Sequence, residues 1–165
     1  MDLARLLRHL ATTSARVRRA FPASALRSIE QAITASEASH TGEIRFVVEG
    51  SLDGLPLLRN QTARERAIEL FARLHVWDTE HNTGVLIYLL LADRRVEIVA
   101  DRGIDAKAGA EAWSVICRGM EAHFGAGDFG HGAVHGIEAV TQLVTRHFPP
   151  VPGDCNELPD APLVL

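Results

Sequence analysis

The chain has little cysteine, no long apolar run and no surplus of positive charge. Its two cysteines, Cys117 and Cys155, lie far apart among 165 residues. An isolated pair of this kind forms no metal-binding or redox motif, so we expect two free thiols. No stretch of about 18 apolar residues is present to cross a membrane. Residues 1–7 are charged and amphipathic, unlike a signal peptide, and this predicts a cytoplasmic protein.

The charge balance argues against a nucleic-acid partner. Lysine and arginine total 17 against 21 acidic residues, which gives a net charge of -4. Binding to phosphate backbones normally requires a concentrated basic face. The one basic cluster, Arg16, Arg18 and Arg19, is short and is typical of a solvated helix face. We therefore expect a protein partner and no membrane span, although no motif identifies that partner or the oligomeric state.

The length and composition fit one globular domain with two appendages. Hydrophobic residues make up 47% and charged residues 23%, and no flexible linker or internal repeat interrupts the chain. We divide it into an N-terminal helix at 1–21, an α/β domain at 22–148 and a proline-rich tail at 149–165.

Apolar periodicity predicts the order of the elements inside that domain. Helical spacing recurs from Pro22 to Ile33, over 61–75, from Trp113 to Phe124 and from Ala133 to Val144. Residues 43–49 alternate as in a strand with one less buried face, 50–56 form a loop, and 85–91 are apolar on both faces.

The connections between the strands predict the fold class. Residues 61–75 form a crossover helix, which makes the strands at 43–49 and 85–91 parallel. Residues 92–95 are too few for a crossover helix, so the strand at 96–101 returns antiparallel by a hairpin. The sequence therefore predicts an α/β fold, a three-layer α/β/α sandwich with a small mixed sheet.

One segment carries a family resemblance. Residues 82–104 contain a buried strand that begins after Asn82, a charged turn, and a second strand that ends in Asp101-Arg102-Gly103. This segment resembles the core of a TPM domain, and the run Gly-Ala-Gly-Asp-Phe at 125–129 is similar to the short turn before the last helix of that family. The resemblance covers about residues 22–148 and implies a short, soluble, bacterial-type member with an α/β/α sandwich.

The predicted topology also gathers oxygen ligands. Because the first two strands are parallel and the hairpin returns the third, the start of strand 43–49, the loop 78–82 and the end of strand 96–101 share one end of the sheet. Carboxylate and amide oxygens suit Ca²⁺ or Mg²⁺. We expect a metal site formed by five residues: Glu43, Asp78, Asn82, Asp101 and Asp105.

The resemblance supports the same ions, since some TPM proteins bind calcium. It runs through Asp78 and Asn82, which occupy positions where the family has acidic residues. The segment between Gly103 and Asp105 is shorter than in the family. The alternative is that Asp105 caps a helix that begins near Lys107 and that Asp78 is an ordinary loop acid.

Catalytic patterns are weak. Ser114 lies in no Gly-x-Ser-x-Gly turn, and Cys117 falls on an apolar helix stripe where a packing thiol is expected. His131 and His135 share a helix face, but the intervening residues lack the glutamate of a zinc hydrolase, which favours surface histidines.

Three functions remain open. The resemblance implies a non-enzymatic binding or adaptor module, a passive calcium-binding domain or a weak metal-dependent phosphatase, in which Arg102 would clamp a phosphate. We favour the adaptor, with a divalent cation at the sheet end, because no nucleophile, base and electrophile can be assigned. If the chain is an enzyme, we expect a phosphomonoester hydrolase.

The tail carries one more expectation. Its prolines block regular structure, yet Leu158, Leu163, Val164 and Leu165 are apolar. We predict that 158–165 docks on a folded surface, its own or that of a second copy, and the alternative is a mobile terminus.

Overall fold

The sheet has four strands. The computed structural model of the chain describes residues 2–153 and 155–165. The strand order is β3-β2-β1-β4, where β1 spans Glu43–Glu49, β2 spans Gly84–Leu90, β3 spans Arg95–Ala100 and β4 spans Leu163–Val164. β1 pairs in parallel with β2 and β4, whereas β2 and β3 are antiparallel. The predicted mixed sheet is thus confirmed, with one further strand at its edge.

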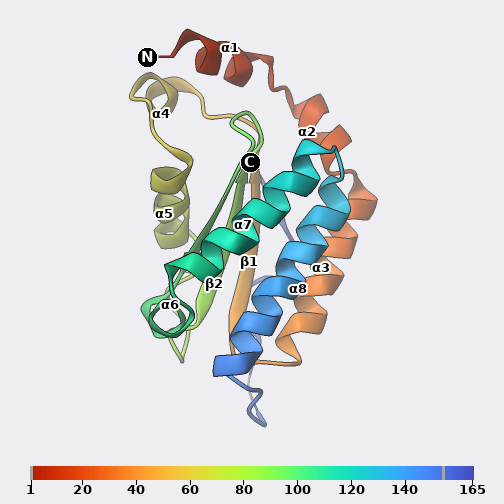
Figure 1. Ribbon diagram of the computed structural model, residues 1–165, viewed down its shortest axis with the longest axis vertical. Helices are drawn as coiled ribbons and strands as arrows, with labels where there is room; N and C mark the ends of the chain where they lie inside the picture. Colours follow the sequence, from red (N-terminus) through yellow and green to blue (C-terminus); the bar gives the residue numbers. More distant parts are fainter. Residues whose placement is uncertain (1, 154) are drawn as a thin grey trace.

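Helices cover both faces of the sheet (Figure 1). One face packs against α3, α7 and α8, and the other packs against α5. The helices are α1 Leu3–Ala11, α2 Ser14–Ala20, α3 Ala23–Glu37, α4 Gly54–Leu58, α5 Ala63–Arg73, α6 Arg102–Ala108, α7 Ala110–Gly125 and α8 Phe129–His147. This arrangement is the expected α/β/α sandwich.

The side chains of the central strand β2 pack into two separate hydrophobic cores. Ile87 and Leu89 pack in the core beneath α3, α7 and α8, whereas Leu86 and Tyr88 pack in the core beneath α5. Successive side chains of a strand point to opposite faces, and both faces of β2 are covered. This explains why β2 is apolar throughout and shows no alternation in the sequence.

Some local predictions were wrong. The single helix expected at 1–21 is two helices, α1 and α2, because the chain breaks at Thr12 and Thr13, and the Thr13 side chain caps α2 by accepting from the Arg16 N–H. The predicted loop at 50–56 contains the start of α4. A helix does not begin near Lys107: α6 begins at Arg102.

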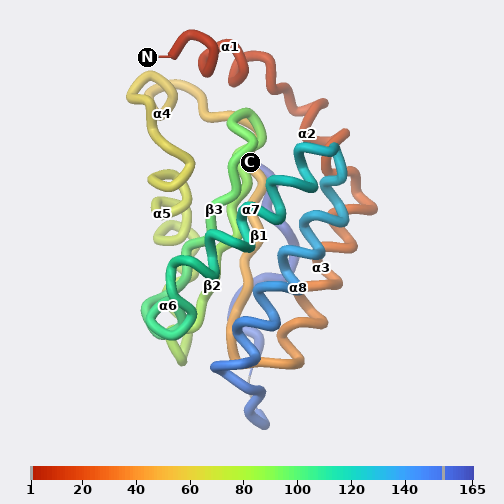
Figure 2. The backbone as a smooth tube through the Cα atoms, viewed as in Figure 1, coloured from red at the N-terminus to blue at the C-terminus, as the bar shows by residue number. Residues whose placement is uncertain are grey.

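The tail docks on its own domain, as predicted. Figure 2 shows the chain turning back after α8 and running beside β1, where β4 adds a strand to the sheet edge. Leu158 is buried in the α5-side core. The Arg45 guanidinium donates to the carbonyl oxygens of Pro159 at 2.6 Å and Ala161 at 2.5 Å. The tail therefore closes an edge that would otherwise expose unpaired backbone groups.

Within residues 2–153 and 155–165, no helix is long and apolar enough to cross a bilayer.

Candidate functional site: the acidic end of the sheet

One row of residues marks the end of the sheet where β1 and β2 begin. Glu43 is in register with Gly84 across the parallel pair. The Asp101 N–H donates to the Gly84 carbonyl oxygen at 2.8 Å. Glu43 and Asp101 therefore lie at the same end of the sheet, on either side of β2.

Only one of the two carboxylate oxygens of Asp101 has a hydrogen-bond partner among the described residues. Asp101 is the N-cap of α6, and its Oδ1 accepts from the Arg102 N–H at 2.7 Å. Its Oδ2 is buried and has no hydrogen-bond partner within the described part of the chain. Buried carboxylate oxygens are normally paired, so this atom is a position where a cation could bind.

Asn82 lies against the same helix turn. A Cβ added at Gly103 would lie 2.5 Å from the Asn82 carbonyl oxygen and 3.2 Å from that of His81. Only glycine permits this approach of α6 to the loop. Asn82 itself has φ 54°, a left-handed conformation that asparagine tolerates. The structure thus brings Asn82 and the helix turn after Asp101 together.

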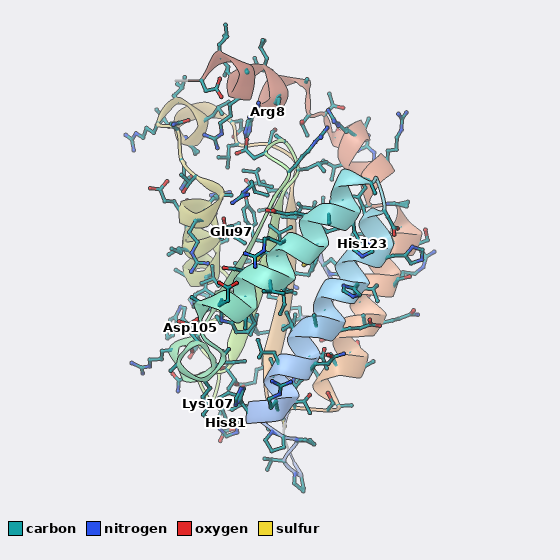
Figure 3. The ribbon with its side chains drawn as sticks, viewed as in Figure 1. Arg8, His81, Glu97, Asp105, Lys107 and His123 are labelled. Carbon is teal, nitrogen blue, oxygen red and sulfur yellow. The ribbon has the colours of Figure 1, made fainter. Side chains whose placement is uncertain are left out.

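The other three predicted ligands are engaged elsewhere or exposed. Glu43 is buried and its Oε2 accepts from the Leu158 N–H at 3.1 Å. Asp105 accepts from the Trp113 indole N–H at 3.0 Å, and in Figure 3 it lies beside the start of α7, apart from His81. Asp78 is exposed. No group of three or more His, Cys, Asp or Glu side chains among the described residues is placed to hold a metal ion.

Glu37 joins this end of the sheet unexpectedly. Burial, with the nearby charges of Glu43 and Asp160, raises its pKa to about 8. Its Oε1 is buried without a hydrogen-bond partner within the described residues. Asp160 is held close by the Thr34 hydroxyl and by the Asn156 amide at 2.5 Å. The sequence offers one sign of this contact, an acid at the end of a helix. Asp160 reaches Glu37 only because the C-terminal tail docks on the domain.

Cys117 and Ser114, the two nucleophiles considered from the sequence, are occupied by packing or helix contacts. Burial raises the pKa of the Cys117 thiol to about 11, so it stays neutral at pH 7. The Ser114 hydroxyl donates to the Ala110 carbonyl oxygen of its own helix. Cys117 and Cys155 are both free thiols, as predicted.

Three histidines, His123, His131 and His135, lie around the turn between α7 and α8. Asp128 lies 2.9 Å from His131 Nδ1 and 3.5 Å from His123 Nδ1, and the His123 ring lies 5.4 Å from the His135 ring. Figure 3 shows His123 at this turn. His131 is an exposed histidine in the first turn of α8, in agreement with the expected surface position.

A buried polar cluster that the sequence did not reveal lies beneath α5. Glu49 accepts from Arg66 Nη2 at 2.8 Å and from the Tyr88 hydroxyl at 2.6 Å. The hydrogen bond to Glu49 raises the pKa of Arg66, and burial beside that carboxylate raises the pKa of Tyr88. These groups satisfy one another, so the cluster joins α5 to the sheet.

Comparison with known proteins agrees with the fold. The mixed sheet with helices on both faces defines an α/β/α sandwich domain. Residues 18–143 match the TPM domain family, and the chain belongs to this family. No functionally curated protein is significantly similar to it.

Two solved structures share the architecture. The chain is 28% identical to the BA42 protein of the psychrophilic bacterium Bizionia argentinensis, with a TM-score of 0.77 over 88% of this chain and 95% of that one. It is 22% identical to the N-terminal domain of a protein from P. gingivalis, with a TM-score of 0.58 over 73% of this chain and 76% of that one. The second likeness shows the fold alone.

Proposed function

We propose that the chain is a non-enzymatic binding or adaptor module of the TPM type that takes a divalent cation, Ca²⁺ or Mg²⁺, at the acidic end of its sheet. The observation that carries the proposal is the buried Oδ2 of Asp101, which no described protein group satisfies. An unpaired buried acceptor costs about 1–3 kcal/mol, and more when it is charged. A hard cation would supply the missing partner.

The ligand set is smaller than the five residues that the sequence predicted. Asp101 would anchor the ion, and Asn82 and Asp78 would contribute oxygens from the adjoining loop. Glu43 and Asp105 would keep their contacts with Leu158 and Trp113. The bound ion would neutralise Asp101 and hold the loop against α6. Because water would fill the remaining positions, we expect weak binding, with a Kd of about 10⁻⁴–10⁻³ M.

The engaged side chains favour binding over catalysis. Cys117 is held neutral, and the Ser114 hydroxyl is bonded to its own helix. Arg102, the arginine expected to clamp a phosphate, is exposed beside Asp101, and one arginine does not make a catalytic site. A phosphatase would need a nucleophile and a proton donor beside the cation.

Thermal unfolding tests the cation site. Protein stripped with chelator is melted with and without CaCl₂ or MgCl₂, and NaCl of equal ionic strength serves as the control. At about one hundred times the Kd, a bound ion adds about 2.7 kcal/mol to the free energy of unfolding. We expect Asp101→Asn to abolish this gain. The matched Asp105→Asn variant should retain it, since the amide oxygen can still accept from Trp113.

Two results would overturn the cation site. One is a melting temperature that Ca²⁺ and Mg²⁺ leave unchanged in the wild-type chain. The other is an increase that Asp101→Asn and Asp105→Asn share equally.

A further inference from the structure

A cavity opens at the end of the sheet opposite Asp101. It has a volume of about 600 Å³ and is lined by α2, the end of β2, the β2–β3 turn and the α7–α8 turn. Figure 1 shows α2 and the α7–α8 turn side by side at this end of the molecule. Clefts of about 300–1,000 Å³ are the usual size for small-molecule sites.

The inner wall of the cavity is apolar. Leu89, Leu91 and Phe124 line it and belong to the buried core. Phe129 also lines it and stacks on Phe124, with ring centroids 5.4 Å apart. Because these side chains are fixed by core packing, the wall is preformed for an apolar ligand group.

The rim of the cavity is cationic. Arg16 and Arg19 of α2 and Arg94 of the β2–β3 turn line it, and no aspartate or glutamate does. Within the described residues these three guanidinium groups make no hydrogen bond and lie within 4.0 Å of no carboxylate. Unpaired arginines around an apolar hollow attract an anion.

The neighbouring acids do not neutralise this rim. Asp93 binds Arg5 at 2.8 Å and His9 at 3.0 Å. Asp128 is held by His131 at 2.9 Å. Asp93 is thus paired with Arg5, and Asp128 contacts the His131 ring, so neither carboxylate pairs with an arginine of the rim.

The β2–β3 turn places Arg94 on this rim. Its φ is 53°, in the left-handed region that glycine or asparagine adopts more easily. Hairpin turns commonly use this conformation, and Asn60 and His75 share it elsewhere in the chain. The turn therefore positions the arginine, and an asparagine at residue 94 would suit the same backbone.

We propose that this cavity binds a small amphiphilic anion, a phosphate or carboxylate head that carries an apolar chain or ring. The head would meet Arg16, Arg19 and Arg94, and the apolar part would lie on Leu89 and the phenylalanines. The site is separate from the proposed cation site, so either can fail without the other.

Octyl phosphate is the probe, titrated calorimetrically into the full chain below its micelle concentration. We expect 1:1 binding that weakens as salt rises. Inorganic phosphate and octanol, which each supply one half of the ligand, should bind at least about tenfold more weakly, a loss of about 1.4 kcal/mol. Octanoate should also bind, because the site would recognise its negative head group and its apolar chain.

Variants locate the binding. Arg16→Gln and Arg94→Asn should each weaken octyl phosphate binding about tenfold. Arg94→Asn should fold well, because asparagine suits the left-handed turn. Arg18→Gln is the matched control: Arg18 is exposed on the same helix but does not line the cavity. It should bind as the wild type does.

Other outcomes overturn the proposal. These are no binding of octyl phosphate, equal binding by all variants, or an equal loss in Arg18→Gln, which would reveal only general charge attraction. Sedimentation with phosphatidylglycerol vesicles separates a lipid headgroup from a free ligand. Vesicle binding that is lost in Arg94→Asn supports the site, whereas vesicle binding without octyl phosphate binding contradicts it.

Discussion

The two ends of the sheet use their charged residues in opposite ways. At the acidic end, Glu43 and Asp105 accept hydrogen bonds from Leu158 and Trp113 of the same chain. At the other end, Arg16 and Arg94 face a cavity without any carboxylate in its lining. The acids that were predicted to bind a metal are mostly hydrogen-bonded within the chain, whereas the arginines at the other end remain available to a ligand.

Burial explains this difference. A buried charge must find a partner, since desolvation costs several kcal/mol, whereas an exposed guanidinium is solvated and can stay unpaired. Arg66 and Arg94 show both cases. Arg66 is half-buried and is held by Glu49 at 2.8 Å, whereas Arg94 is exposed on a turn. Groups left over after the fold has used its partners are therefore the better candidates for ligand contacts.

The largest predicted effect on stability distinguishes an arginine that is paired with a carboxylate from an arginine that is unpaired. Glu49→Gln removes one of the two carboxylates that pair with Arg66, the other being Glu69 at 3.0 Å, and should lower the free energy of unfolding by about 3 kcal/mol. Arg16→Gln should change it by no more than about 0.5 kcal/mol. Urea unfolding measures both. A loss below about 1 kcal/mol for Glu49→Gln would contradict the assignment of this cluster as a structural joint.

The next effect concerns the tail that closes the acidic end. Leu158→Ala should cost about 2–3 kcal/mol, because Leu158 is buried against the α5-side core. Val151→Ala, at an exposed position of the same tail, should cost less than about 0.5 kcal/mol. Equal melting temperatures for the two variants, together with fast motion throughout the tail by NMR, would show that the tail does not dock in solution.

A pH-dependent effect comes from Glu37, and solvent screening of this half-buried carboxyl group keeps it smaller than the effects above. Its pKa is raised from 4.5 to about 8, so between these values the folded chain holds a proton that the unfolded chain has lost. The stabilisation is complete below pH 4.5 and is lost as pH rises to about 8. Urea unfolding at several pH values should show stability falling over this range.

Glu37→Gln should remove that part of the pH dependence and stabilise the chain at pH 8. Glu30→Gln, an exposed position on the same helix, is the control and should keep the wild-type profile. Parallel profiles for wild type and Glu37→Gln would exclude a proton held at Glu37.

The smallest predicted signal is catalytic. Purified protein should hydrolyse p-nitrophenyl phosphate barely above background, and Cys117→Ala should not change that rate. Turnover of many per second that Asp101→Asn abolishes without unfolding the chain would favour a metal-dependent phosphatase instead.

The sequence predicted the framework because strong local patterns specify it. The apolar run at 84–90 and the short turn after it require a central strand and a hairpin. The break at Thr12 and Thr13 was missed, because the leucine periodicity before it gives no sign of a stop.

The site was harder to predict, because each side chain's role depends on distant partners. Asp105 accepts a hydrogen bond from Trp113. Glu43 accepts one from the backbone of the tail, more than a hundred residues away in the sequence. The unpaired Oδ2 of Asp101 is a property of the assembled structure. The same holds for the cavity, which joins Arg16 and Arg94 from separate segments.

The most direct test of a binding module with a different ligand at each end is one ¹H–¹⁵N NMR titration series. CaCl₂ is added to the stripped full chain, followed by octyl phosphate in the same sample. Calcium should shift amides of 78–83 and 101–103, and octyl phosphate should then shift a separate set in α2, the β2–β3 turn and the α7–α8 turn. Unchanged spectra in both steps, or shifts spread evenly over the surface, would contradict the account.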